Sequence, residues 1–103
     1  MFANCSSLSE LELNKLDNVI NMENMFYGCK NLTFLRISNS ITNNYVENIG
    51  GVFSGCLSLA TLDLSNFHTD KVSNISYLFY NCESLIDISL NHFISLLFYF
   101  FTL

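Results

Sequence analysis

The sequence predicts an α/β fold, a solenoid in which each coil of roughly 26 residues contributes one short helix and one short parallel strand. Three observations predict it. A Phe-x-x-Cys core recurs at intervals of 24, 27 and 26 residues, the same apolar positions surround each copy, and differences in length are confined to one part of the unit. The four cores are Phe2/Cys5, Phe26/Cys29, Phe53/Cys56 and Phe79/Cys82.

The residues around each core keep a constant spacing. An Asn followed by Met or Ile lies upstream of the core, at Asn21, Asn48 and Asn74, and a line of the form L-x-x-L-x-L lies downstream. The connectors that join the units are residues 14–18, 38–45 and 65–71, with lengths of 5, 8 and 7 residues. Insertions are tolerated where the backbone runs over the surface. We therefore expect the constant part to form the stacked core and the connectors to be exposed loops.

The segment from the upstream Asn to the Cys is predicted to be the helix. Each Asn is a good N-cap, because its side-chain oxygen can accept a hydrogen bond from the amide two or three residues later. The residue before the Cys is always Gly or Asn, which favours a left-handed turn at a helix C-terminus. These residues are Asn4, Gly28, Gly55 and Asn81. A helix this short is not stable alone in water, so neighbouring coils must hold it.

The L-x-L end of each unit is predicted to be a strand, because apolar residues alternate there over a short run. The pairs expected to point inward are Leu11/Leu13, Leu35/Ile37, Leu62/Leu64 and Ile88/Leu90. Since the same register recurs in every coil, we expect the strands to pair in parallel, about 4.8 Å apart, as one ladder.

Two longer patterns carry a resemblance to a known family. The line L-x-x-L-x-L-x-x-F/L occurs over residues 8–16, 59–67 and 85–93, and it is the leucine-rich repeat signature. The pattern V-x-N-M/I-x-x-M/V/L-F-x-x-C-x-x-L, with D-L-S-N-F-x-T at residues 63–69, resembles the BspA-like leucine-rich repeat surface proteins of microbes. The likeness covers residues 1–93. It implies a leucine-rich repeat solenoid, a cell-surface or secreted location, and a role in adhesion or protein binding.

Composition narrows the class of protein and of partner. The chain has 103 residues, of which 50% are apolar, so it is one folding unit and not a disordered one. Only 13% of the residues are charged, against about 25% in typical soluble domains, which indicates a part of a larger protein or an associating one. The net charge of −5 and the four Lys/Arg residues exclude a basic patch for nucleic acid or an anionic membrane.

The sequence offers no constellation for catalysis, a cofactor or a metal. Every Cys lies at the same repeat position among apolar residues, where we expect free, buried thiols and not disulfides. Zinc would need clustered Cys or Cys/His spacing, which is absent. His68 and His92 follow their Cys at different offsets, so a Cys-His nucleophilic pair is not expected. We predict a protein that is not an enzyme and takes no cofactor.

The remaining candidate site is the outward face of the strands. Side chains that alternate with the inward Leu residues should point to solvent, and solenoids commonly bind along the face that their strands line. This face consists of Glu10, Glu12, Phe34, Arg36, Thr61, Asp63, Asp87 and Ser89. The alternative is that these eight residues are ordinary solvent-exposed strand positions that bind no ligand. As a binding face it would suit a basic or polar partner.

The two ends break the pattern. Residues 94–103 form an apolar tail that is too short to span a bilayer, which takes about 20 residues. They could cap the last coil, begin a membrane segment, or be adventitious sequence. The chain starts inside a unit and shows no signal peptide. We expect three complete coils and a partial first one in residues 1–93, and ends that are those of a fragment.

These observations lead to a functional prediction. We expect a non-catalytic protein-interaction or adhesion module of a microbial surface protein, binding a protein or host-surface ligand through the strand-lined face. Two alternatives stay open: structural spacer repeats with no ligand of their own, and an intracellular scaffold that binds other proteins.

Overall fold

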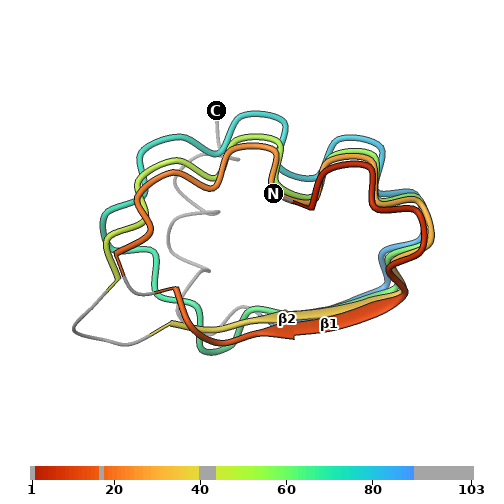
Figure 1. Cartoon of the computed structure of the whole chain (residues 1–103), viewed down its shortest axis with the longest axis horizontal. Helices are drawn as coiled ribbons and strands as arrows, with labels where there is room; N and C mark the ends of the chain where they lie inside the picture. The colour runs from red at the N-terminus through yellow and green to blue at the C-terminus, as the bar shows by residue number, and fades with distance from the viewer. Residues whose placement is uncertain (1, 17, 40–43, 90–103) are drawn as a thin grey trace.

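The computed structural model describes residues 2–16, 18–39 and 44–89. It contains a single sheet of four parallel strands in the order β1-β2-β3-β4. The strands are β1 (Glu10–Leu13), β2 (Phe34–Ile37), β3 (Thr61–Asp63) and β4 (Asp87–Ser89). Viewed down the shortest axis, successive coils follow nearly the same outline, with the strands along one side and a series of turns along the opposite side (Figure 1).

The predicted strand ladder is confirmed. Leu11 pairs with Leu35, Leu35 with Leu62, and Leu62 with Ile88, so equivalent positions of all four coils lie side by side. Leu35 and Leu62 are fully buried, whereas Ile88 in the last coil remains 37% exposed. The alternating apolar residues of the first three coils therefore face a shared interior, most completely in the two middle coils, and Leu90 lies outside the described residues.

The predicted helices are wrong, and with them the assignment to an α/β leucine-rich repeat solenoid. The described residues contain no helix, and the segment from Asn to Cys forms two successive turns instead. In the second coil these are a first turn at residues 22–25 and a second turn at residues 26–29. They are closed by bonds from the amide of Met25 to the carbonyl of Met22 and from Cys29 to Phe26.

Two features of the backbone explain why turns replace the helix. Alternate amides, such as those of Asn24 and Phe26, donate to carbonyls of the following coil, at Gly50 and Val52. A helix would direct its amides to its own carbonyls four residues earlier. In addition, the third residue of each turn has a positive φ, which a right-handed helix cannot contain. The coil-to-coil ladder thus continues around the turns as well as through the strands.

The left-handed residue before each Cys is confirmed. Asn4, Gly28, Gly55 and Asn81 have φ values of 59°, 72°, 74° and 59°. The same requirement recurs four residues earlier, in the first turn, at Asn24, Gly51 and Tyr77, with φ of 55°, 65° and 57°. The predicted Asn contacts are also present, since the side chains of Asn21, Asn48 and Asn74 accept the amide two residues later. They open a turn and not a helix.

Columns of equivalent side chains fill the interior. The rings of Phe2 and Phe26 stack with centroids 5.3 Å apart, and those of Phe53 and Phe79 stack at 5.8 Å. Such contacts stabilise by dispersion and by area removed from water. The described chain therefore consists of stacked, nearly identical coils without a helical layer.

Three regions bear on the other sequence predictions. The apolar tail, residues 94–103, lies outside the described residues, as does His92. In the described part of the chain, no helix has the length and apolarity that a bilayer crossing requires. The backbone amide of His68 donates to the side chain of Asn39 at 2.7 Å, in agreement with its predicted place in a loop.

Candidate functional site

The structure gathers the eight predicted site residues on the outer side of the sheet, which we call the strand face. The register aligns them in two columns, and no residue of the set is placed elsewhere. One column is Glu10, Phe34, Thr61 and Asp87, and the other is Glu12, Arg36, Asp63 and Ser89. The face therefore carries four carboxylates and one guanidinium.

Arg36 occupies the centre of the strand face. Its Nη1 lies 3.1 Å from Oε1 of Glu12, and its Nε lies 3.0 Å from Oδ2 of Asp63. The guanidinium carbon is also 5.6 Å from the ring centroid of Phe34, which is the geometry of a cation–π contact. The Arg36 side chain is 47% exposed, so these ion pairs are weakened by water and salt.

The carboxylate of Asp63 is held mainly by its own loop. Hydrogen bonds from the hydroxyl and the backbone amide of Ser65 lower the pKa of Asp63, and Arg36 adds a smaller contribution in the same direction. The Ser65 hydroxyl donates to Oδ1 at 2.7 Å. Asp63 is thus charged and fixed in position even without the arginine.

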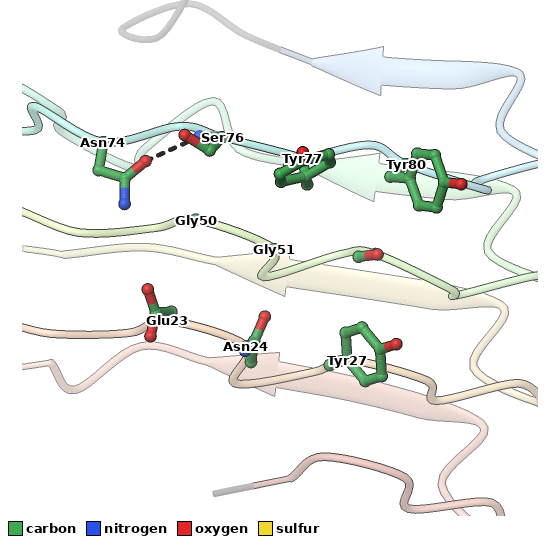
Figure 2. Close-up of a pocket in the computed structure, with 10 residues that line it drawn as sticks. Glu23, Asn24, Tyr27, Gly50, Gly51, Asn74, Ser76, Tyr77 and Tyr80 are labelled. Carbon is green, nitrogen blue, oxygen red and sulfur yellow. Dashed lines mark hydrogen bonds between the residues drawn. The ribbon is translucent and has the colours of Figure 1, made fainter.

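A second candidate surface lies on the turn side of the coils, opposite the sheet. It is an open groove of about 430 Å³, which we call the turn groove. Its floor is formed by the third coil, at Gly50, Gly51 and Ser54. One wall comes from the second coil, at Glu23, Asn24 and Tyr27, and the other from the fourth coil, at Asn74, Ser76, Tyr77 and Tyr80 (Figure 2).

The turn groove exists because one coil carries small residues where its neighbours carry large ones. The position after the core Phe is Tyr27 in the second coil, Ser54 in the third and Tyr80 in the fourth. Gly51 lies between the coils of Asn24 and Tyr77, and a Cβ added at Gly51 would overlap the side chain of Asn24. The groove therefore lies where Ser54 stands between two tyrosines, whereas the space beside Gly51 is taken by the side chain of Asn24.

The aromatic walls of the turn groove are exposed to an unusual degree. Tyr27, Tyr77 and Tyr80 are 46%, 74% and 57% exposed. The rings of Tyr77 and Tyr80 meet edge to face, with an interplanar angle of 85°. The one charged lining residue is Glu23, and its Oε2 accepts a hydrogen bond from Asn48 at 3.3 Å.

The cysteines lie between these two surfaces and are free thiols as predicted, but only Cys29 and Cys56 are buried, whereas Cys5 and Cys82 are partly buried. Cys29, Cys56 and Cys82 each donate a hydrogen bond to the carbonyl of the core Phe in the preceding coil, as in Cys56 to Phe26 at 3.2 Å and Cys82 to Phe53 at 2.9 Å. Burial raises the pKa of Cys56 to about 12 and that of Cys82 to about 11. A protonated, buried thiol is a poor nucleophile, so these groups act in packing.

In residues 2–16, 18–39 and 44–89, His, Cys, Asp and Glu side chains do not gather in a group of three that could hold a metal ion. The thiols of Cys29, Cys56 and Cys82 each donate to a Phe carbonyl. The prediction that the protein is not an enzyme and takes no cofactor stays a prediction.

Comparison with known proteins places the chain in a family. The family described as "Mycoplasma protein of unknown function, DUF285" matches residues 1–95, nearly the whole sequence. The chain belongs to this family. We found no match to a curated protein or to a solved structure. Membership assigns no activity to the chain, and the resemblance to BspA-like surface proteins stays a prediction.

Sequence reasoning identified the strand face but missed the turn groove. The missed residues are the three tyrosines, which lie in the segment that was predicted to be helical. A signal was available in the alignment of the repeats, where Tyr27, Ser54 and Tyr80 share one position and the neighbouring pair Gly50-Gly51 marks the smallest coil. Without the turn geometry, these residues could not be assigned to one outward surface.

Proposed function

We propose that the chain is a non-catalytic interaction module of a microbial surface protein, and that a protein partner with a basic surface docks on the strand face. The observation that carries this proposal is the register of the sheet. It sets four carboxylates and the ring of Phe34 at fixed spacing on one outer surface, while the other side of the same strands holds the core.

Charge supports the choice of partner. With one arginine against four carboxylates, the strand face has a net charge of −3, within a chain of net charge −5. Two of the carboxylates, Glu10 and Asp87, form no ion pair with another described residue. A basic surface would be attracted to such a face and oriented by it during association. The resemblance to microbial surface proteins supports the location.

One observation favours a second candidate function, a structural spacer without a ligand. Arg36 already bridges Glu12 and Asp63 and covers one side of Phe34, so the centre of the strand face is partly satisfied by its own contacts. A spacer would tolerate any substitution on this face that preserves folding, whereas a docking surface would not.

Charge reversal on the strand face separates the two functions. We expect the double variant Glu10→Lys with Asp87→Lys to capture at least tenfold less protein from host-cell surface extracts than the unmodified chain, because two attractive charges become repulsive. The matched control is Asp70→Lys with Glu83→Lys, which changes the net charge equally at exposed positions outside the face.

A second double variant, Phe34→Ala with Arg36→Glu, tests the centre of the strand face. It removes the ring and its cation–π contact, and we expect it to reduce capture as well. Equal capture by the unmodified chain and both strand-face variants would rule out docking on this face and leave the spacer. Circular dichroism and thermal unfolding of every variant check that the fold is retained.

A further inference from the structure

We infer that the turn groove is a second binding site, independent of the strand face, and that its ligand is a neutral glycan chain of extended, β-1,4-linked six-membered sugar rings. The juxtaposition that carries this inference is two exposed tyrosines, Tyr27 and Tyr80, held two coils apart across a floor of small residues. Four further observations support it.

The first observation is the spacing of the two rings. Parallel neighbouring strands lie about 4.8 Å apart, so equivalent residues two coils apart are separated by roughly 10 Å. In an extended β-1,4-linked glycan, alternate sugar rings are separated by a similar distance. Tyr27 and Tyr80 can therefore each contact one sugar, with the sugar between them lying over Ser54.

The second observation is the orientation of the rings. Figure 2 shows the faces of Tyr27 and Tyr80 turned toward the viewer, whereas Tyr77 is seen nearly on edge, consistent with the angle of 85° between Tyr77 and Tyr80. Two ring faces that look outward form a platform. The C–H bonds on one side of a sugar ring carry a partial positive charge and pack on the negative face of an aromatic ring.

The third observation is the polar chemistry of the lining. None of the four basic residues, Lys15, Lys30, Arg36 and Lys71, lines the groove, and Glu23 is its charged residue. An anionic ligand is therefore disfavoured. Among the described residues, the side-chain amide of Asn24 and the hydroxyls of the three lining tyrosines have no hydrogen-bond partner. These groups, with Glu23, are available to sugar hydroxyls.

The fourth observation is backbone strain at Tyr77. This residue has a φ of +57°, where its equivalents in the first turn are Asn24 and Gly51, two types that accept a left-handed conformation. A bulky residue in this conformation is strained. Its ring is 74% exposed, so folding gains little from it. A strained aromatic ring that folding does not bury, beside a groove, supports a role in ligand contact.

Titration calorimetry of the full chain with defined oligosaccharides tests the inference. We expect tetra-N-acetylchitotetraose or cellotetraose to bind, maltotetraose to bind at least tenfold more weakly because its α-1,4 linkages curve the chain, and the corresponding β-1,4 disaccharide to bind at least tenfold more weakly because it cannot reach both tyrosines. The absence of binding by both β-1,4 tetrasaccharides at millimolar concentration would overturn the inference.

Variants assign the binding to the platform. Tyr27→Ala and Tyr80→Ala should each reduce affinity at least tenfold, whereas Tyr27→Phe should retain most of it. The matched control is Tyr45→Ala, which removes an exposed tyrosine outside the groove, packed against Lys71. Unchanged affinity in both groove variants, or an equal loss in the control, would contradict the proposed site.

The variant Tyr77→Asn distinguishes a binding role of Tyr77 from a purely structural one, because the two roles predict different changes in stability and in binding. It replaces a strained residue by one that tolerates positive φ, so we expect a higher unfolding temperature together with at least threefold weaker binding of the tetrasaccharide. A decrease in stability, or unchanged binding, would refute the role assigned to Tyr77. Because the strand-face variants leave the groove intact, they should bind the tetrasaccharide normally, which separates this inference from the proposed protein docking.

Discussion

The strand side and the turn side of the coils are two hydrogen-bonded ladders with different demands on sequence. On the strand side, β1 to β4 keep an extended backbone that any residue can adopt, and the inward Leu positions set the register. On the turn side, a positive φ is required at the third position of each turn, so the residues found there are mostly Gly and Asn. One ladder depends on side-chain burial and the other on backbone conformation.

Their outward surfaces differ as well. The strand face satisfies much of its own charge, since Arg36 contacts both Glu12 and Asp63. The turn side exposes the rings of Tyr27, Tyr77 and Tyr80 around a groove. The difference between the two surfaces shows that the coils can keep the same stacking geometry while their outward-facing residues vary. The variation at Tyr27, Ser54 and Tyr80 creates a site that the repeat alone does not specify.

The largest expected effect is on the turn side. Gly55→Val should lower the free energy of unfolding by about 3 kcal/mol, because a β-branched residue is strained at φ 74°. Its Cβ would also approach the backbone of Gly28 to 3.4 Å. Gly55→Asn is the control and should cost less than about 1 kcal/mol, since Asn tolerates this conformation. If urea denaturation showed the same loss of stability for Gly55→Val and Gly55→Asn, the positive φ would not be the reason that glycine is needed at this position.

A smaller effect should appear when the pH is raised, through the thiols between the two ladders. Burial holds the pKa of Cys56 in the folded state at about 12, above the value of 9.0 for an unperturbed thiol. Stability from this group is therefore fully present below about pH 9 and is lost as the pH rises toward 12, because the unfolded chain ionises first. The loss between pH 9 and pH 10 should be about 1 kcal/mol.

Cys56→Ala isolates that contribution from the ionisation of tyrosines and of other thiols. Denaturation curves at several pH values should show a shallower decline for Cys56→Ala than for the unmodified chain over the same range. Parallel declines would mean that the thiol is not protected by burial. Reaction with a thiol reagent gives a second measure, and Cys56 should react only as the protein unfolds.

The smallest effect is expected on the strand face. Arg36→Ala should change the free energy of unfolding by less than about 1 kcal/mol, since exposed ion pairs contribute little. Ser65→Ala should raise the pKa of Asp63 more than Arg36→Ala does, because it removes the Ser65 hydroxyl, whose hydrogen bond is the largest single cause of the lowering. Carboxyl chemical shifts during an NMR titration measure both. A larger pKa shift of Asp63 in Arg36→Ala than in Ser65→Ala would show that the arginine is the main cause of the lowered pKa.

The strands, their register and the columns of Phe and Cys could be predicted because they depend on spacing along one chain. Once Leu35 and Leu62 occupy the same position in successive units, parallel pairing follows from burying both on one side. The positive φ at Gly28 could be predicted for the same local reason. The helix could not be excluded in this way, because an Asn that accepts the amide two residues later can begin either a helix or a turn.

The sequence by itself therefore determined the period, the strand register, the left-handed position before each Cys and the eight residues of the strand face. Only the tertiary structure decided that alternate amides of the turn side donate to the next coil, as Met22 does to Asn48, and not within a helix. It also decided that Tyr27 and Tyr80 flank the small residues of the third coil. The physical reason is that both outcomes depend on contacts between coils, which become available to the backbone only when the coils are stacked.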